Sequence, residues 1–162
     1  MYRDFIAHYA DHIVERSRPF PGVEDALDAL SGAGCRLAVC TNKLEWLSLK
    51  LLDALGLKQR FAAICGADTF GVAKPDAAIL HRTVAQAGGS TDRAVMVGDA
   101  ITDIAVARAA GIAVVAVDFG YSPTPVATLS PDRVVSRFER VPEAVFALLG
   151  LETDEFSQKV NG

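Results

Sequence analysis

Two short polar motifs in this chain could bind a phosphorylated ligand. Thr41-Asn42 follows an apolar run, and a hydroxyl beside backbone N–H groups at such a turn can hold an anionic oxygen. Lys74 lies in the segment Lys-Pro-Asp, and its ammonium group can neutralise a phosphate as a point charge. Each motif also has a structural interpretation, because Thr41 or Asn42 could cap the next helix and Lys74 could be a surface lysine.

A pair of aspartates, Asp99 and Asp103, forms the third polar group. Gly98 ends an apolar run and lets the backbone turn, and the two aspartates stand four residues apart. That spacing is about one helical turn, so both carboxylates can face one point. Hard oxygen ligands suit Mg²⁺, and the pair therefore predicts a metal or phosphate site. Either aspartate alone could instead be a helix N-cap.

Other reactive side chains indicate no further site. His8 and His12 share the spacing of a helix face, but Tyr9 stands where a zincin motif needs glutamate, and no third ligand is evident. His81 is expected to be structural, and Trp46 is expected in the core or at an interface. The three cysteines contain no C-x-x-C pair and are expected to be reduced, mostly buried thiols.

Apolar periodicity divides the chain into alternating helices and strands. Near-continuous apolar strands between helices are typical of a doubly wound parallel sheet, an α/β fold that binds ligands beyond the carboxyl ends of its strands. We expect helices over residues 2–16, 23–30, 44–55, 76–84, 104–110 and 141–149, and strands near 35–40, 62–65, 94–97, 113–117 and, more weakly, 133–135.

Composition narrows the class of protein. The 162 residues suit one domain, 51% of them are hydrophobic and the net charge is −4. A nucleic-acid partner is not expected, since such proteins usually carry a basic surplus. The longest apolar run, residues 112–117, is too short to cross a membrane, and the N-terminus shows no apolar signal segment. We expect a cytoplasmic protein without a membrane or nucleic-acid partner.

The order Thr41-Asn42, then Lys74-Pro-Asp, then Asp99-x-x-x-Asp103 resembles the haloacid dehalogenase-like phosphohydrolase superfamily. The stretches 19–24, 71–76, 103–111 and 117–121 look like phosphoglycolate phosphatases in particular, and the resemblance runs from about residue 5 to about residue 149. It implies a Rossmann-like core, a Mg²⁺ cofactor and hydrolysis of a small phosphorylated metabolite such as 2-phosphoglycolate through an aspartyl-phosphate.

The resemblance also implies a role for each matching residue. Thr41 would donate its hydroxyl to the phosphoryl group, helped by the backbone of Asn42, and Lys74 would balance charge between that group and the nucleophile. Asp99 would ligate Mg²⁺, and Asp103 would support the metal site. The implied catalytic residues are therefore Thr41, Lys74 and Asp99, the phosphate-binding residues Thr41, Asn42 and Lys74, and the metal-binding residues Asp99 and Asp103.

One family motif has no counterpart in this sequence. The family nucleophile belongs to an Asp-x-Asp motif at the end of the first strand, but no two aspartates here are separated by a single residue. We therefore expect a truncated chain: a cap remnant over 1–18, a core over 19–150, a flexible tail over 151–162, and a reading frame that continues about 60 to 80 residues upstream of Met1. The missing central strand should leave two strand edges facing a gap, which direct pairing closes, another segment or chain fills, or which leaves the protein poorly stable.

Two other classes of protein share part of this pattern. A response-regulator receiver also combines Asp, Thr and Lys on a doubly wound sheet, but there the acidic residues precede Thr and Lys, whereas here they follow. A non-catalytic descendant that binds phosphate or protein through the same fold remains the alternative to a phosphatase. The sequence leaves a homo-oligomer open.

Overall fold

The computed structural model describes residues 21–120 and 123–151. The predicted helix over 2–16 and the predicted tail beyond residue 151 lie outside the described residues, and the expected domain limits stay a prediction. No helix in the described part of the chain is long and apolar enough to cross a membrane. In chain order, the helices and strands are α2 (Val23–Gly32), β1 (Ala38–Cys40), α3 (Glu45–Ala54), β2 (Ala63–Cys65), α4 (Ala77–Gln86), β3 (Val95–Gly98), α5 (Ile101–Ala110), β4 (Ala113–Val117), β5 (Arg133–Val135) and α6 (Val141–Leu149).

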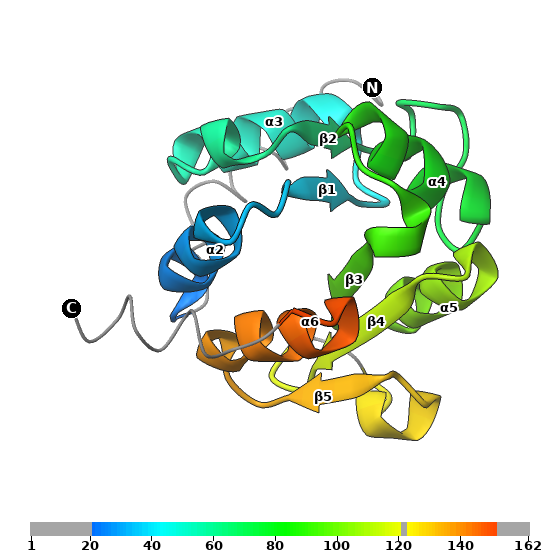
Figure 1. Cartoon of the computed structure of the whole chain (residues 1–162). Helices are drawn as coiled ribbons and strands as arrows, with labels where there is room; N and C mark the ends of the chain where they lie inside the picture. The colour runs from blue at the N-terminus through cyan, green and yellow to red at the C-terminus, as the bar shows by residue number, and fades with distance from the viewer. Residues whose placement is uncertain (1–20, 121–122, 152–162) are drawn as a thin grey trace.

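All five described strands pair in parallel, as the alternating pattern predicted (Figure 1). β1 pairs with β2, and β3, β4 and β5 form a second ladder in that order. The bounds of β4, β5 and α6 match the expected ones, whereas β1 is shorter than the apolar run 35–40 and α5 begins three residues before the expected 104. The α/β class with a parallel, helix-covered arrangement is thus confirmed.

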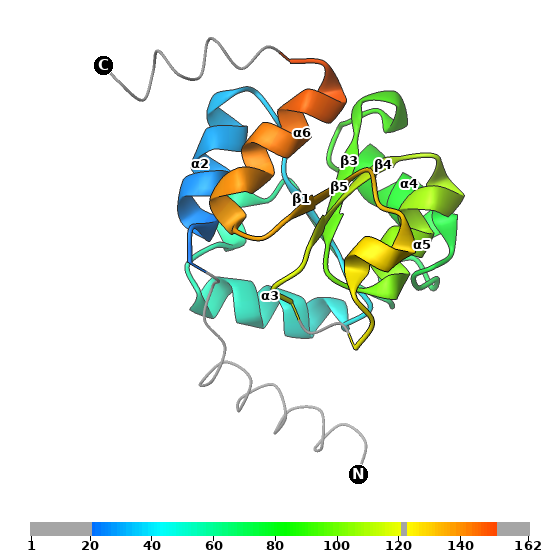
Figure 2. The same ribbon diagram turned by 90° about the horizontal axis from the view of Figure 1, so that it is seen from below.

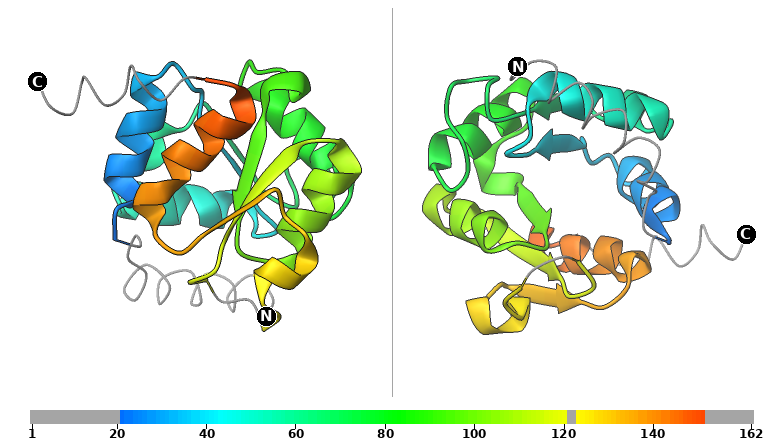
Figure 3. Two further views of the ribbon diagram at one scale, coloured as in Figure 1. Left: turned by 60° about the horizontal axis from the view of Figure 1, so that its bottom comes forward. Right: turned by 180° about the vertical axis from the view of Figure 1, so that it is seen from behind.

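The strands do not form one continuous sheet. Within residues 21–120 and 123–151, β1 pairs only with β2 and β3 pairs only with β4, so the two ladders belong to separate sheets. Figure 3 shows β1 and β3 on opposite sides of a break in the strand layer, which agrees with the predicted pair of facing edges. Direct pairing of these edges, one of the ways in which the gap could close, does not occur among the described residues.

Helix contacts hold the two sheets together. α4 contacts both β1 and β2 and packs on α5, which covers β3 and β4. On the other side of the strands, α2 packs on α6, and α6 contacts β3, β4 and β5 (Figure 2). The contact of α4, on β1 and β2, with α5, on β3 and β4, therefore ties the two sheets together where no strand pairing among the described residues does so.

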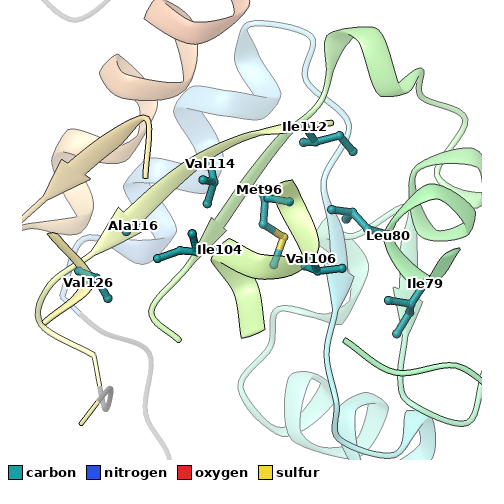
Figure 4. Close-up of a cluster of buried hydrophobic side chains, with 10 residues drawn as sticks. Ile79, Leu80, Met96, Ile104, Val106, Ile112, Val114, Ala116 and Val126 are labelled. Atoms are coloured by element: carbon teal, nitrogen blue, oxygen red, sulfur yellow. The ribbon is translucent and has the colours of Figure 1, made fainter. Parts of the chain in front are cut away.

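Two clusters of buried side chains make up most of the core. The first lies between α4, α5 and the strands β3 and β4, and Figure 4 shows its members, which include Ile79, Met96, Val106 and Val114. The second joins Leu30 of α2 to β4, β5 and α6. Burial of such side chains is the main stabilising term, worth about 1.5–3 kcal/mol for each large aliphatic residue.

Candidate phosphate and metal site

Thr41 continues the β1 ladder by one residue, because its backbone N–H donates to the Cys65 carbonyl over 3.0 Å. Its Oγ1 accepts from the Lys43 backbone N–H over 3.1 Å, which closes a tight turn after the strand. The expected alternative, that Thr41 or Asn42 caps the following helix, is wrong: the N-cap of α3 is Leu44, whose own side chain forms no cap hydrogen bond. The Thr41 hydroxyl hydrogen is left to donate elsewhere.

Asn42 connects the end of β1 to the loop that carries Lys74. Its Nδ2 donates to the Lys74 carbonyl over 3.1 Å, and its Oδ1 accepts from the Lys74 backbone N–H over 2.7 Å. One side-chain amide thus satisfies both backbone groups of the same residue, which fixes where the Lys74 side chain starts. The Lys74–Pro75 peptide bond is cis.

The Lys74 ammonium group is an interior cation, so the surface-lysine interpretation is wrong. Lys74 Nζ donates to Asp103 Oδ1 in an ion pair, and the two side chains are only 9% and 8% exposed. A pair this well shielded depends on both partners, because removing one leaves an uncompensated buried charge.

Asp103 also organises the backbone that follows β3. Its Oδ2 accepts from the Asp99 and Ala100 backbone N–H groups over 3.0 and 3.1 Å. Ala100 is the N-cap of α5, so Asp103 stabilises the start of its own helix from one turn inside it. Asp103 therefore caps the helix and also takes part in the polar site.

Asp99 stands at the carboxyl end of β3 and is half-buried. Two glycines make room for the acidic pair. A Cβ atom at Gly98 would lie 2.3 Å from Asp103 Oδ2, and one at Gly120 would lie 2.2 Å from Asp99 Oδ2. The turn at Gly98 agrees with the expectation from the sequence, whereas Gly120 was not expected at the site; its signal in the sequence is the Asp-Phe-Gly segment that follows β4.

A second set of contacts supports the loop after Thr41. The Gly66 N–H donates to Thr69 Oγ1 over 2.8 Å, and that hydroxyl donates to Glu45 Oε2 over 2.6 Å. Asp68 Oδ1 accepts from the Glu45 backbone N–H over 2.8 Å at the start of α3. A Cβ at Gly66 would come within 2.4 Å of the Lys43 carbonyl, so this close approach requires glycine. None of these residues stands in a motif that the sequence singles out.

The predicted residues lie together as one chain of contacts. Asn42 holds the Lys74 backbone, Lys74 pairs with Asp103, and Asp103 binds the backbone of Asp99. Since Asn42 follows β1 and Asp99 follows β3, this chain of contacts spans the two sheets at the carboxyl ends of their strands. A cation, a hydroxyl and a carboxylate at such an edge suit a phosphate with its counter-ion.

The donor set is compatible with Mg²⁺, though incomplete by itself. Mg²⁺ is commonly held by one or two carboxylates together with substrate phosphate and water, and Asp99 and Asp103 supply two carboxylates one turn apart. Asp103 already accepts from Lys74 and from two amides, so Asp99 is the better direct ligand. Within residues 21–120 and 123–151, no cluster of three or more His, Cys, Asp or Glu side chains suited to a metal is present.

The other side chains considered as candidates, the histidines, Trp46 and the cysteines, differ in how well they match their expected positions. His81 forms a 2.9 Å hydrogen bond with the Ala110 carbonyl, as expected of a structural histidine. Trp46 is 41% exposed, so of its two expected positions the core is wrong, and the interface stays a prediction. Cys65 is buried, and Cys35 and Cys40 are half-buried; all three thiols are free, as expected. His8 and His12 lie outside the described residues.

Comparisons with known proteins agree with this arrangement. The sequence model of the haloacid dehalogenase-like hydrolase family matches residues 1–117, and the chain belongs to that family. It is 53% identical over 135 residues to a phosphoglycolate phosphatase from Mesorhizobium japonicum, covering 83% of this chain and 60% of the relative. It is 47% identical over 149 residues to a phosphoglycolate phosphatase from Agrobacterium fabrum, covering 92% and 64%.

Solved structures give the same class of protein. A crystal structure described as a predicted phosphoglycolate phosphatase from Haemophilus somnus superposes with a TM-score of 0.82 at 31% identity, covering 88% of this chain and 64% of the other. A structure described as a β-phosphoglucomutase from Thermotoga maritima shares the fold at 21% identity, with a TM-score of 0.73 and coverage of 85% and 64%. The chain spans somewhat less than two thirds of the length of these curated relatives.

Proposed function

We propose that this chain is part of a Mg²⁺-dependent phosphomonoester hydrolase that acts on 2-phosphoglycolate. The observation that carries the proposal is the buried Lys74–Asp103 ion pair, tied to Asn42 and to the backbone of Asp99 where two parallel strands end. Relatives named phosphoglycolate phosphatase at 53% and 47% identity support the choice of substrate.

In this proposal, three groups bind the phosphoryl oxygens. The Thr41 hydroxyl hydrogen donates to one oxygen, because its oxygen already accepts from Lys43 and the hydrogen is left available. The Asn42 backbone N–H donates to another. Lys74 supplies positive charge beside them, since Asp103 and Asn42 fix both ends of its side chain. Phosphoryl transfer depends mainly on such positioning and on charge neutralisation.

Asp99 would hold the magnesium ion, and Asp103 would support the metal site. When bound, the ion would neutralise phosphoryl charge. Gly120 leaves the Asp99 carboxylate the space it occupies, and Asp103 fixes the Asp99 backbone through its amide. The protein's own part is thus to hold one carboxylate in place and one ammonium group next to it.

The nucleophile is proposed to come from outside this sequence. A family nucleophile is an aspartate whose carboxylate attacks phosphorus, the alcohol of the substrate leaves, and water then hydrolyses the aspartyl-phosphate. No Asp-x-Asp segment occurs in these 162 residues. The curated relatives are longer than the matched region, which supports an upstream segment carrying the nucleophile and most of a cap.

The test compares two proteins in one assay of phosphate release from 2-phosphoglycolate with Mg²⁺. Residues 1–162 alone should stay at background, because loss of a covalent nucleophile can cost about a million-fold. The protein translated with its upstream coding sequence should turn over substrate, and Asp99→Asn in that longer protein should abolish turnover. Asp92→Asn is the matched control, since Asp92 is exposed in the turn before β3.

Two results would contradict the proposal. Turnover of about one per second by residues 1–162, abolished by Asp99→Asn, would show a nucleophile within this chain. An in-frame stop directly before Met1, with a native mass near 17.2 kDa, would favour the non-catalytic descendant instead. The cytoplasmic location, the absence of membrane and nucleic-acid partners and the oligomeric state stay predictions.

A further inference from the structure

Two of the three cysteines stand side by side on paired strands. In the parallel ladder of β1 and β2, Cys40 and Cys65 are Cα partners, and both thiols are free. Partners on neighbouring parallel strands point to the same face, with their Cα atoms about 4.8 Å apart. That spacing falls within the range of about 4.4–6.8 Å that a disulfide bridges. The ladder therefore brings two thiols to the distance at which they can be joined.

Both thiols of the pair face α4, and the third cysteine does not. α4 contacts β1 and β2, and its buried Thr83 hydroxyl is a hydrogen-bond partner of Cys40 and of Cys65. Cys40 packs against the cluster formed by α4, α5, β3 and β4, whereas Cys35 packs against the cluster that contains α6. Cys35 is thus a thiol of the same chain that lies apart from the pair.

The two paired thiols differ in their access to solvent. Cys40 is half-buried, whereas Cys65 is 0% exposed. A dissolved oxidant therefore meets Cys40 first, and Cys65 can react only with a group already attached there. Burial raises the pKa of both thiols, and the Thr83 hydroxyl offsets part of that rise. Since the thiolate is the reactive form, exchange is slow at neutral pH and faster in mild alkali.

We propose that Cys40 and Cys65 are a redox pair that a small disulfide, such as glutathione disulfide, oxidises to an intramolecular disulfide. The Cys40 thiolate attacks one sulfur of the oxidant and breaks its S–S bond, which leaves a mixed disulfide and one glutathione. The Cys65 thiolate then attacks Cys40 Sγ and releases the second glutathione. The protons of the two cysteines end on the two glutathione thiols, so two thiols are oxidised and one disulfide is reduced.

The bridge lies at the strand end that carries Thr41. Thr41 follows Cys40 directly, and its backbone N–H donates to the Cys65 carbonyl over 3.0 Å. Parallel Cα–Cβ bonds keep the two Cβ atoms about as far apart as the Cα atoms, whereas a disulfide brings them to about 3.8 Å. Bridging therefore draws the end of β1 toward β2 by up to about 1 Å. The inference does not rest on the proposed phosphatase activity.

The test maps disulfides in purified residues 1–162 after exposure to glutathione disulfide at about pH 8.5, where thiols begin to ionise. Remaining thiols are alkylated, and the chain is digested with trypsin without reduction. This digestion places each cysteine in its own peptide, 17–36, 37–43 or 61–82. Peptides 37–43 and 61–82 should be linked at least about tenfold more often than any other pair, and dithiothreitol should separate them.

Three variants and one change of solvent serve as controls. Cys35→Ser is the matched control and should leave the link intact. Cys65→Ser should leave Cys40 as a mixed disulfide with glutathione, and Cys40→Ser should leave the buried Cys65 unmodified. In concentrated urea the excess of the Cys40–Cys65 link should be lost, because an unfolded chain closes the shorter loop between Cys35 and Cys40 more readily.

Each of four other results overturns the proposal. Cys35 in the main linked product would show that the strand register does not select the pair. A mixed disulfide that persists on Cys40 of the parent chain would show that Cys65 is out of reach. Unmodified Cys40 would show a thiol closed to the oxidant. Equal products in buffer and in urea would show that the fold does not bring the thiols together. These results are all read without any measurement of phosphate release.

Discussion

At the scale of single residues, the site depends on side chains that hold one another. Asn42 was expected to contribute its backbone to a phosphate, and the structure gives its side chain a separate task, since it binds both backbone groups of Lys74. Asp103 likewise binds two amides and the Lys74 ammonium group at once. Substitutions at these two positions therefore test the site without the need for turnover.

Asn42→Ala should lower the free energy of unfolding by about 1–3 kcal/mol, because two hydrogen bonds are lost, each worth about 0.5–1.5 kcal/mol net. Asn42→Asp keeps an acceptor for the Lys74 N–H but loses the donor to its carbonyl, so its loss should be intermediate or larger. Urea denaturation gives both values. Gln59→Ala, at an exposed position in the turn after α3, is the control and should stay within about 0.5 kcal/mol of the parent.

Asp103→Asn should be much more costly, about 3–5 kcal/mol, since it keeps the shape of the side chain but leaves the buried Lys74 cation without its anion. The double variant Lys74→Met, Asp103→Asn should recover part of that loss, because it removes the unpaired charge. Equilibrium unfolding of the two single variants and the double variant measures the coupling. A cost below about 1 kcal/mol for Asp103→Asn would mean that the pair behaves like a surface salt bridge.

At the scale of elements, glycines set how closely the loops after β3 and β4 approach. Gly120→Ala would place a methyl group 2.2 Å from Asp99 Oδ2. Displacing this carboxylate should cost about 1–3 kcal/mol of stability, the usual range for overpacking. In the longer protein proposed above, the same change should lower kcat. Thermal unfolding and kinetics check the two effects.

Gly32→Ala is the matched control for that substitution, since a Cβ there meets no atom within 4 Å and the residue ends α2. It should be neutral, or stabilise by up to about 1 kcal/mol, because alanine restricts the unfolded chain and favours helix. If Gly32→Ala destabilises as much as Gly120→Ala, the close approach to Asp99 is not the cause.

At the scale of the whole molecule, the two sheets depend on helix contacts for their connection. Leu30 of α2 is 7% exposed and belongs to the cluster that includes Val145 of α6. Leu30→Ala should cost about 2–5 kcal/mol and should accelerate amide exchange in β1 and β2 as well as in α2. Loss of stability with unchanged exchange in β1 and β2 would show that α2 does not connect the halves.

The thiols predict a loss of stability in alkali. Burial raises the pKa of the Cys65 thiol, and that of Cys40, above the ordinary value of 9.0. As the pH rises, the unfolded chain releases these protons before the folded chain does. The contribution of the thiols to the free energy of unfolding is therefore fully present below pH 9.0 and is lost as the pH rises through the folded pKa. Urea midpoints at about pH 8 and about pH 10 measure how steeply stability falls with pH. Cys65→Ala should make this fall shallower, and an unchanged fall would contradict its assignment to the Cys65 thiol.

The sequence by itself determined the order of elements and the identity of the polar motifs. Apolar runs bounded by Gly and Pro located the strands, because a buried parallel strand needs apolar residues on both faces. Asp76 was correctly expected among the residues that start α4, where it is the N-cap and accepts from the Ala78 N–H over 2.9 Å. Local chemistry of this kind depends only on neighbours in the chain.

Tertiary structure alone decided the partners of those motifs. Lys74 and Asp103 are 29 residues apart, and Asn42 and Lys74 are 32 residues apart. No pattern of spacing predicts that Lys74 is buried, that Asn42 binds its backbone or that Gly120 borders Asp99. These contacts exist because parallel strands bring their carboxyl ends together, and helix packing sets the distance between the two sheets. Such contacts depend on the three-dimensional path of the chain, which local residue preferences do not encode.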